Sequence, residues 1–232
     1  MSTMDYCAIS AAAPPKGRTS NLLDPKDLSI ETLAVGSVFA GLSIFFLSGR
    51  LFVNRKRLAM ADYLAIIGFI FSTGYSGVIM NMHSYSRHIW DVPVCWFMQE
   101  RLSKLLFVSN IMLGITQFTT KLPIMVLYLQ MFSVERKMKL FIKLAIAFSA
   151  LVYIPHLILV IVFQAPRAGE SWSDPGTNGR TRKMTYYAPI HGVCEVILNI
   201  WMLIIPLLVI RNLQITRRKK IQLSTVFLTG IM

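Results

Sequence analysis

One run of 28 almost uninterrupted apolar residues, Leu105–Phe132, limits the fold of this chain more than any other feature. About 20 apolar residues in a helix cross the hydrocarbon core of a bilayer, so this run is long enough to span a membrane. It contains one full charge, Lys121, well away from either end. An ammonium group near the middle of a bilayer costs about 3 kcal/mol or more, so it normally faces the interior of a helix bundle and has a partner there.

The rest of the chain repeats this pattern of apolar runs separated by polar connections, and 54% of its residues are hydrophobic. We predict an all-α, polytopic transmembrane helix bundle with five complete spans. The last apolar run has only 12 residues, which is about 18 Å of helix, so the chain is expected to be truncated inside a sixth span. The predicted units are a polar N-terminal tail (1–30) and a transmembrane domain (31–232), with spans at 31–53, 61–82, 105–131, 141–163 and 187–210 and a partial span at 221–232.

The net charge of +13 comes from basic residues that cluster between the apolar runs, as they do in cytoplasmic loops of membrane proteins. Basic residues that formed one face would instead have indicated a nucleic-acid partner. We therefore expect a multi-pass protein of the plasma membrane, with the lipid bilayer as its surroundings and no nucleic acid bound. The density of basic residues predicts that Arg55, Lys137 and Lys219 lie inside, and that the N-terminus and the loops at His88 and Trp172 lie outside.

The cysteine and histidine residues give no sign of a metal site, a cofactor or an enzyme. No pair of cysteines has CxxC spacing, and the histidines do not form a ligand motif such as HxxxH. The residues concerned are Cys7, Cys95, Cys194, His83, His88, His156 and His191.

Four polar side chains inside the predicted spans are candidate ligand-binding residues: Lys121, Glu195, Asn199 and His156. At 1.5 Å per residue, Lys121 and Glu195 differ in depth by about 11 Å, so direct contact needs a helix tilt or an intermediary. Asn199 lies between them in depth and could accept from the ammonium while donating to the carboxylate. We predict a Lys121–Asn199–Glu195 chain, with His156 at its outer end, on the floor of an outward-facing pocket. The alternative is that Lys121 and Glu195 only neutralise each other and hold the bundle together.

Several motifs resemble those of one family. The first outer loop carries Arg87, His88, Trp90, Asp91 and Pro93 in the run RHIWDVP, and the third span carries KLPIMVLYLQMF from Lys121. With Ala61-Asp62 at the start of the second span and RRKK followed by FLTG near the end, these motifs resemble fungal rhodopsin-domain integral membrane proteins. That group includes the satratoxin-cluster membrane protein family and the Pth-type receptor-like proteins, and the resemblance covers the chain from about Arg50 onward.

The resemblance implies a seven-span, receptor-like fold that senses an extracellular small molecule or surface cue, with a signalling partner at the basic cytoplasmic loops. The alternatives are an accessory or transport-related membrane protein of a secondary-metabolite gene cluster, or an inactive truncated member. Retinal is disfavoured because the Schiff-base lysine of rhodopsins lies in the seventh span.

The sequence also departs from the family pattern. Pro123 stands in place of Ser, Gln130 in place of Arg, and Glu195 with Asn199 in place of Asn followed by Asp. Ala165 stands where the family has an outer cysteine. We therefore expect Cys7 and Cys95 to be at best weakly coupled, without an essential disulfide.

Overall fold

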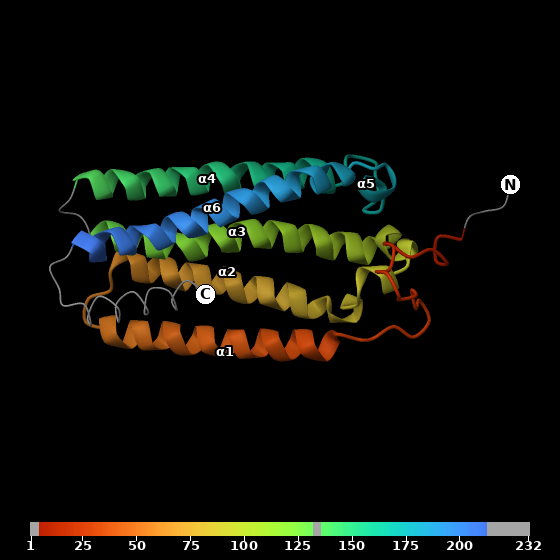
Figure 1. The fold of residues 1–232 in the computed structure, drawn as a ribbon, viewed down its shortest axis with the longest axis horizontal. Coiled ribbons are helices and arrows are strands. Elements are labelled where there is room, and N and C mark those ends of the chain that lie inside the picture. The colour runs from red at the N-terminus through yellow and green to blue at the C-terminus, as the bar shows by residue number, and fades with distance from the viewer. Residues whose placement is uncertain (1–4, 132–135, 213–232) are drawn as a thin grey trace.

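The computed structural model describes residues 5–131 and 136–212, and within them it is helical without a β-strand. Five long helices run side by side (Figure 1): α1 (Ser29–Asn54), α2 (Met60–Asn81), α3 (Glu100–Met131), α4 (Arg136–Gln164) and α6 (Arg182–Asn212). The short helix α5 (Asp174–Thr177) and three 3-10 turns, η1 (His83–Tyr85), η2 (Ile89–Asp91) and η3 (Val94–Met98), lie in the connections.

All five long helices have the length and hydropathy to cross a membrane. The prediction of a polytopic all-α bundle is therefore confirmed, whereas the predicted partial span at 221–232 lies outside the described residues. Helix α1 has no buried residue and exposes large apolar side chains such as Phe39, Phe45 and Phe46. Apolar surface of this extent suits contact with lipid, because a helix satisfies its own backbone hydrogen bonds in hydrocarbon.

The helices follow one another through the bundle in chain order, so that α2 lies between α1 and α3, and α3 lies between α2 and α4. Helix α6 packs on α4 and runs obliquely across it toward α3 (Figure 1). The segment before α1, the loop between α2 and α3, and α5 all lie at one end of the bundle (Figure 1), which we call the loop end. The turn between α1 and α2 lies at the opposite end.

The buried core lies between α3, α4 and α6. One face of α4 buries Met138, Ile142, Ala145, Ser149 and Val152, with the spacing of three and four residues that places side chains on one helix face. This stripe packs against Met125 and Tyr128 of α3 and Leu198, Met202 and Ile205 of α6.

A buried carboxylate closes the turn between α1 and α2. Asp62 is 0% exposed and accepts hydrogen bonds from Arg50 Nε at 2.7 Å, Asn54 Nδ2 at 3.1 Å and the backbone N–H of Ala59 at 2.9 Å. A buried charge is tolerated when it is paired and its lone pairs are satisfied. Arg50 therefore joins the first two helices through Asp62.

Helices α2 and α3 approach so closely at Gly68 that a side chain would not fit. A Cβ atom at Gly68 would lie 2.8 Å from the carbonyl oxygen of Thr119 on α3. Thr116 on the same helix donates to the carbonyl of Phe71 at 3.1 Å, which fixes the register of the two helices. Gly77, also on α2, has no atom within 4 Å of its Cβ position.

Gly68→Ala should destabilise the protein, because the methyl group forces the backbones of α2 and α3 apart. We expect a loss of about 1–3 kcal/mol, which is typical of overpacking, measured by thermal unfolding in detergent. The control is Gly77→Ala, which should be neutral or slightly stabilising because the site is open and alanine favours the helix. Equal effects of the two substitutions would mean that the α2–α3 contact is not this close.

Candidate functional site

A largely buried polar cluster joins three helices of the bundle. It consists of Lys121, Tyr153 and Glu195, one residue from each of α3, α4 and α6. Lys121 Nζ donates to the Tyr153 hydroxyl at 2.7 Å and also to a carboxylate oxygen of Glu195. The Tyr153 hydroxyl in turn donates to the other oxygen of Glu195. The side chains of Lys121 and Glu195 are only 10% and 16% exposed, and Tyr153 is 1% exposed.

This geometry changes the predicted polar chain: Tyr153 takes part in it and Asn199 does not. Lys121 and Glu195 meet directly, so the tilt of α6 across the bundle removes the difference in depth that straight helices would have (Figure 1). Asn199 is exposed on α6 and does not lie between them, and Tyr153 takes the third place in the cluster. Tyr153 was missed in the sequence, although it precedes His156 by three residues and so shares its helix face.

The predicted outer member of the chain, His156, lies one turn further along α4 and is 6% exposed. Its imidazole packs against that of His191 on α6, with 4.4 Å between the ring centroids, and lies near the Tyr187 ring at 6.0 Å. Gly114 of α3 makes room for this ring, because a Cβ atom there would lie 2.8 Å from His156 Cδ2. His156 and His191 therefore stand between the charged cluster and the loop end.

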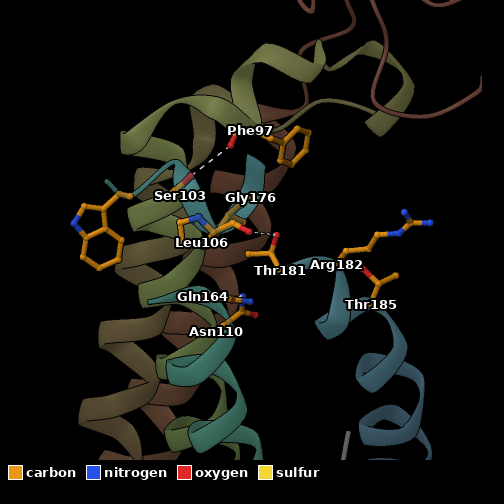
Figure 2. A pocket seen from close by; sticks show the side chains of 11 residues that line it. Phe97, Ser103, Leu106, Asn110, Gln164, Gly176, Thr181, Arg182 and Thr185 are labelled. Atoms are coloured by element: carbon orange, nitrogen blue, oxygen red, sulfur yellow. Dashed lines mark hydrogen bonds between the residues drawn. The ribbon is translucent and has the colours of Figure 1, made fainter. Parts of the chain in front are cut away.

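Two adjoining cavities extend from this histidine pair toward the loop end. The lower cavity, of about 450 Å³, is lined by side chains that include His156, His191, Leu113, Tyr187 and Ala188. The upper cavity, of about 380 Å³, is lined by residues of η3, α3, α4, α5 and α6 (Figure 2). The two share Asn110, Gln164, Thr181 and Thr185.

A hydrogen bond crosses the boundary between these cavities, from Asn110 Nδ2 on α3 to Gln164 Oε1 on α4 at 3.1 Å. Volumes of this size are in the range of small-molecule pockets, about 300–1,000 Å³. The two cavities form a pocket between three helices with polar side chains at its edge and apolar side chains on its walls. The pocket ends on the histidine pair.

The residues of the outer-loop motif contact the segment before α1 (residues 5–28). Asp91 is 7% exposed and accepts from the backbone N–H of Asn21 at 2.9 Å, while the Trp90 carbonyl accepts from the Ser20 hydroxyl. Pro93 forms an isolated antiparallel bridge with Ser10.

The motif also orders itself through its rings. The imidazole of His88 stacks on Trp90 at 4.5 Å between centroids, and the Arg87 guanidinium lies 4.9 Å from the centroid of the Trp96 ring. Cation–π contacts of this kind contribute about 0.5–1 kcal/mol at exposed sites. The motif residues therefore form a folded platform for the N-terminal segment.

The expectation that Cys7 and Cys95 are at best weakly coupled is wrong. The two residues form a disulfide, with 5.0 Å between their Cα atoms. The backbone N–H of Cys95 donates to the carbonyl of Tyr6 at 3.3 Å. This hydrogen bond aligns Cys7, the next residue, with Cys95. Composition alone could not reveal this pairing, because the two cysteines are 88 residues apart in sequence and are brought together by tertiary contacts.

The connection between α4 and α6 is held by a partly buried arginine. Arg180 donates to the Ala165 carbonyl at 2.7 Å and to Glu170 at 2.8 Å. The backbone N–H of Arg167 and the nearby Arg180 guanidinium hold the pKa of the Glu170 carboxyl below its usual range. The backbone of Ala165, where the family resemblance predicts an outer cysteine, is thus fixed by a hydrogen bond.

Removing one charge of the Lys121–Glu195 pair should cost more than removing both. We expect Lys121→Met or Glu195→Gln alone to lower stability by about 3–5 kcal/mol, because each leaves a buried ion unpaired. The double variant should lose less than either single variant. A double-mutant cycle on thermal stability in detergent measures this coupling.

The matched control is the exposed Lys104–Glu100 pair on α3, at 2.8 Å. Lys104→Met and Glu100→Gln should show a coupling of about 0–1 kcal/mol, as surface ion pairs do. If the buried pair behaves additively, the two residues are not partners in the protein.

Cys7→Ser, Cys95→Ser and the double variant should all lower the thermal unfolding temperature by the same amount, because each removes the same bond. The expected loss is about 2–4 kcal/mol, typical for a native disulfide. Cys194→Ser, at the free cysteine, is the control and should have little effect. An effect of Cys95→Ser that Cys7→Ser does not share would contradict the pairing, and peptide mapping without reductant checks it directly.

Comparison with known proteins identifies the family. The model of the fungal rhodopsin domain matches residues 47–232, a range that contains the cluster, both cavities and the outer-loop motif. A SAT4 family membrane protein of Emericella nidulans is 31% identical over 134 residues, which are 57% of this chain and 35% of that protein.

The chain thus spans about a third of the length of that relative. No solved structure matches the chain. The family match agrees with the resemblance carried by the outer-loop and third-span motifs, and the five apolar helices agree with a multi-pass membrane protein. The chain belongs to the fungal rhodopsin domain family of integral membrane proteins.

Proposed function

We propose that this protein is a receptor-like membrane protein that binds a small molecule in the paired cavities between α3, α4 and α6. The observation that carries the proposal is that the lower cavity ends on His156 and His191, one helical turn from the buried Lys121–Tyr153–Glu195 cluster. A pocket one helical turn from a charged cluster inside a membrane bundle is a candidate functional site, because intramembrane ionisable groups are costly and commonly mark functional sites.

The same three helices line the pocket and supply the cluster, so a molecule in the pocket can affect the packing of the helices that hold the cluster. His156 is one turn from Tyr153 on α4, and His191 is one turn from Glu195 on α6. A molecule that contacts both histidines would therefore act on neighbours of the ion pair. A movement of α6 relative to α3 would change the contact between Lys121 and Glu195. Coupling between two sites requires such a contact that differs between two states of the protein.

We further propose that the loop end faces the outside of the plasma membrane. Arg55, just after α1, and Lys137, in the first turn of α4, lie at the opposite end, as the positive-inside tendency requires. The Cys7–Cys95 disulfide lies at the loop end, and disulfides persist on the oxidising side of a membrane. The basic inner connections are the surface for a cytoplasmic signalling partner.

Single-cysteine labelling tests whether the pocket opens outward. In a Cys194→Ser background, Thr185→Cys on the cavity wall should react with a membrane-impermeant maleimide added to intact cells. Lys137→Cys should react only after the membrane is permeabilised. Labelling of Lys137→Cys from outside would overturn the orientation, and with it the sensing of an extracellular molecule.

A second substitution tests the cavity itself. Ala188→Phe fills the lower cavity, so it should slow the labelling of Thr185→Cys. Ala147→Phe, on an exposed position of α4, adds the same volume outside the pocket and should leave the labelling rate unchanged. Unchanged labelling with Ala188→Phe would contradict an open pocket at this place.

A further inference from the structure

A second hollow lies between α1 and α2, away from the pocket between α3, α4 and α6. It has a volume of about 260 Å³ and is lined by residues of α1 and α2 and by Thr120 of α3. A smaller cavity of about 70 Å³ shares three of its residues and continues it along α1 and α2. We call the two together the α1–α2 groove. On α1 it extends from Phe39 to Arg50, which is about 16 Å of helix, so it is elongated in the direction of a lipid acyl chain.

The walls of the α1–α2 groove suit hydrocarbon. The lining surface is more apolar than polar, and its largest apolar side chains are those of Phe39, Phe46, Leu47 and Phe69. Hydroxyl groups also line it, but most of them donate to the carbonyl oxygen four residues earlier in their own helix and need no partner from a ligand. These are the hydroxyl groups of Ser43, Thr73 and Thr120.

The end of the groove at the α1–α2 turn carries a cation with free donors. Arg50 lines the groove, and its side chain is 29% exposed. Its Nε donates to Asp62, whereas its two Nη atoms have no hydrogen bond to a described residue and are not among the buried unpartnered atoms. Both Nη atoms are therefore accessible. Arginine presents such donors in a geometry that matches the oxygen atoms of a phosphate group.

The turn that follows α1 adds three more cations at the same end. Arg55, Lys56 and Arg57 are exposed, and none of them belongs to an ion pair among the described residues. The one carboxylate nearby, Asp62, is buried and already holds Arg50 and Asn54. The positive charge of this turn is thus not neutralised by the described part of the protein, and the hydrocarbon groove begins beside it.

We propose that the α1–α2 groove binds one anionic phospholipid, with its phosphate at Arg50 and the basic turn and one acyl chain between α1 and α2. A free phosphate ion would use only the cations and leave the groove empty. A zwitterionic phospholipid has the same phosphate and chains but no net charge to offset the turn. Basic residues at a membrane surface attract anionic lipids by about 1 kcal/mol each. The inference goes beyond the proposed pocket and does not depend on it.

Native mass spectrometry of the full chain in detergent, titrated with lipid, tests the proposal. The probes are palmitoyl-oleoyl phosphatidylglycerol and the phosphatidylcholine with the same chains. We expect one phosphatidylglycerol to bind about 5- to 10-fold more tightly than phosphatidylcholine. Replacing Arg55, Lys56 and Arg57 together by Gln should weaken phosphatidylglycerol binding by about 10-fold or more, because each basic residue contributes about 5-fold. A 100-fold excess of inorganic phosphate should not displace the lipid.

Matched controls separate the groove from general surface charge. Replacing Lys137, Lys139 and Lys143 together by Gln removes the same charge from exposed positions of α4 and should leave the tight binding unchanged. Ser43→Phe fills the groove and should weaken phosphatidylglycerol binding. Ser48→Phe, at an exposed position of α1 that lines no part of the groove, should not. Thermal unfolding of each variant establishes that it is folded before the affinities are compared.

Each contrary outcome overturns the proposal. Equal binding of the two lipids, or equal losses from the turn and α4 triple variants, would mean that no particular anionic lipid site exists at the turn. Unchanged binding in Ser43→Phe would mean that the acyl chain does not lie in the groove. Displacement of the lipid by inorganic phosphate would mean that the cations bind phosphate alone. None of these results bears on the labelling of Thr185→Cys, which tests the pocket between α3, α4 and α6.

Discussion

The pairing of Lys121 with Glu195 is the interaction on which the rest of the bundle depends. A lysine in a membrane-spanning helix is costly unless it is neutralised, and its side chain is too short to reach a partner that is far away in depth. Helix α6 must therefore cross α4 at an angle that brings Glu195 level with Lys121. Tyr153 donates to the same carboxylate, so α4 is tied in as well. The packing of three helices follows from one buried charge.

A second constraint acts at the loop end, where the N-terminal segment and the outer loop hold each other. Asp91 is buried because the backbone of Asn21 supplies a donor, and the Cys7–Cys95 bond joins the same two segments. The loop also contributes Phe97 to the upper cavity. The shape of the pocket mouth therefore depends on a segment that precedes the matched family domain.

The five complete spans and the partnership of Lys121 with Glu195 could be predicted, because hydropathy and the cost of a buried charge leave few choices. The role assigned to Asn199 could not, because depth along straight helices ignores the tilt of α6. The role of Tyr153 was not predicted, because a single hydroxyl in an apolar run is uncharged and does not by itself indicate a buried partner. The Cys7–Cys95 disulfide was not predicted, because backbone contacts such as that between Cys95 and Tyr6 align the two cysteines. These features depend on the tertiary arrangement of the helices and loops, which the periodicity of the sequence does not contain.

The order of polar groups along the bundle has a consequence for how a bound molecule could act. The histidine pair separates the cavity from the ion pair by about one helical turn, so a molecule in the cavity would not compete for Lys121 or Glu195. The costly ion pair would then stay intact in both the free and the occupied protein. Binding could shift α6 only by the difference in contacts at the cavity walls, for example a few hydrogen bonds of about 0.5–1.5 kcal/mol each. Such a difference is comparable to typical coupling free energies between sites, about 1–3 kcal/mol, and so is large enough to carry a signal without breaking the bundle.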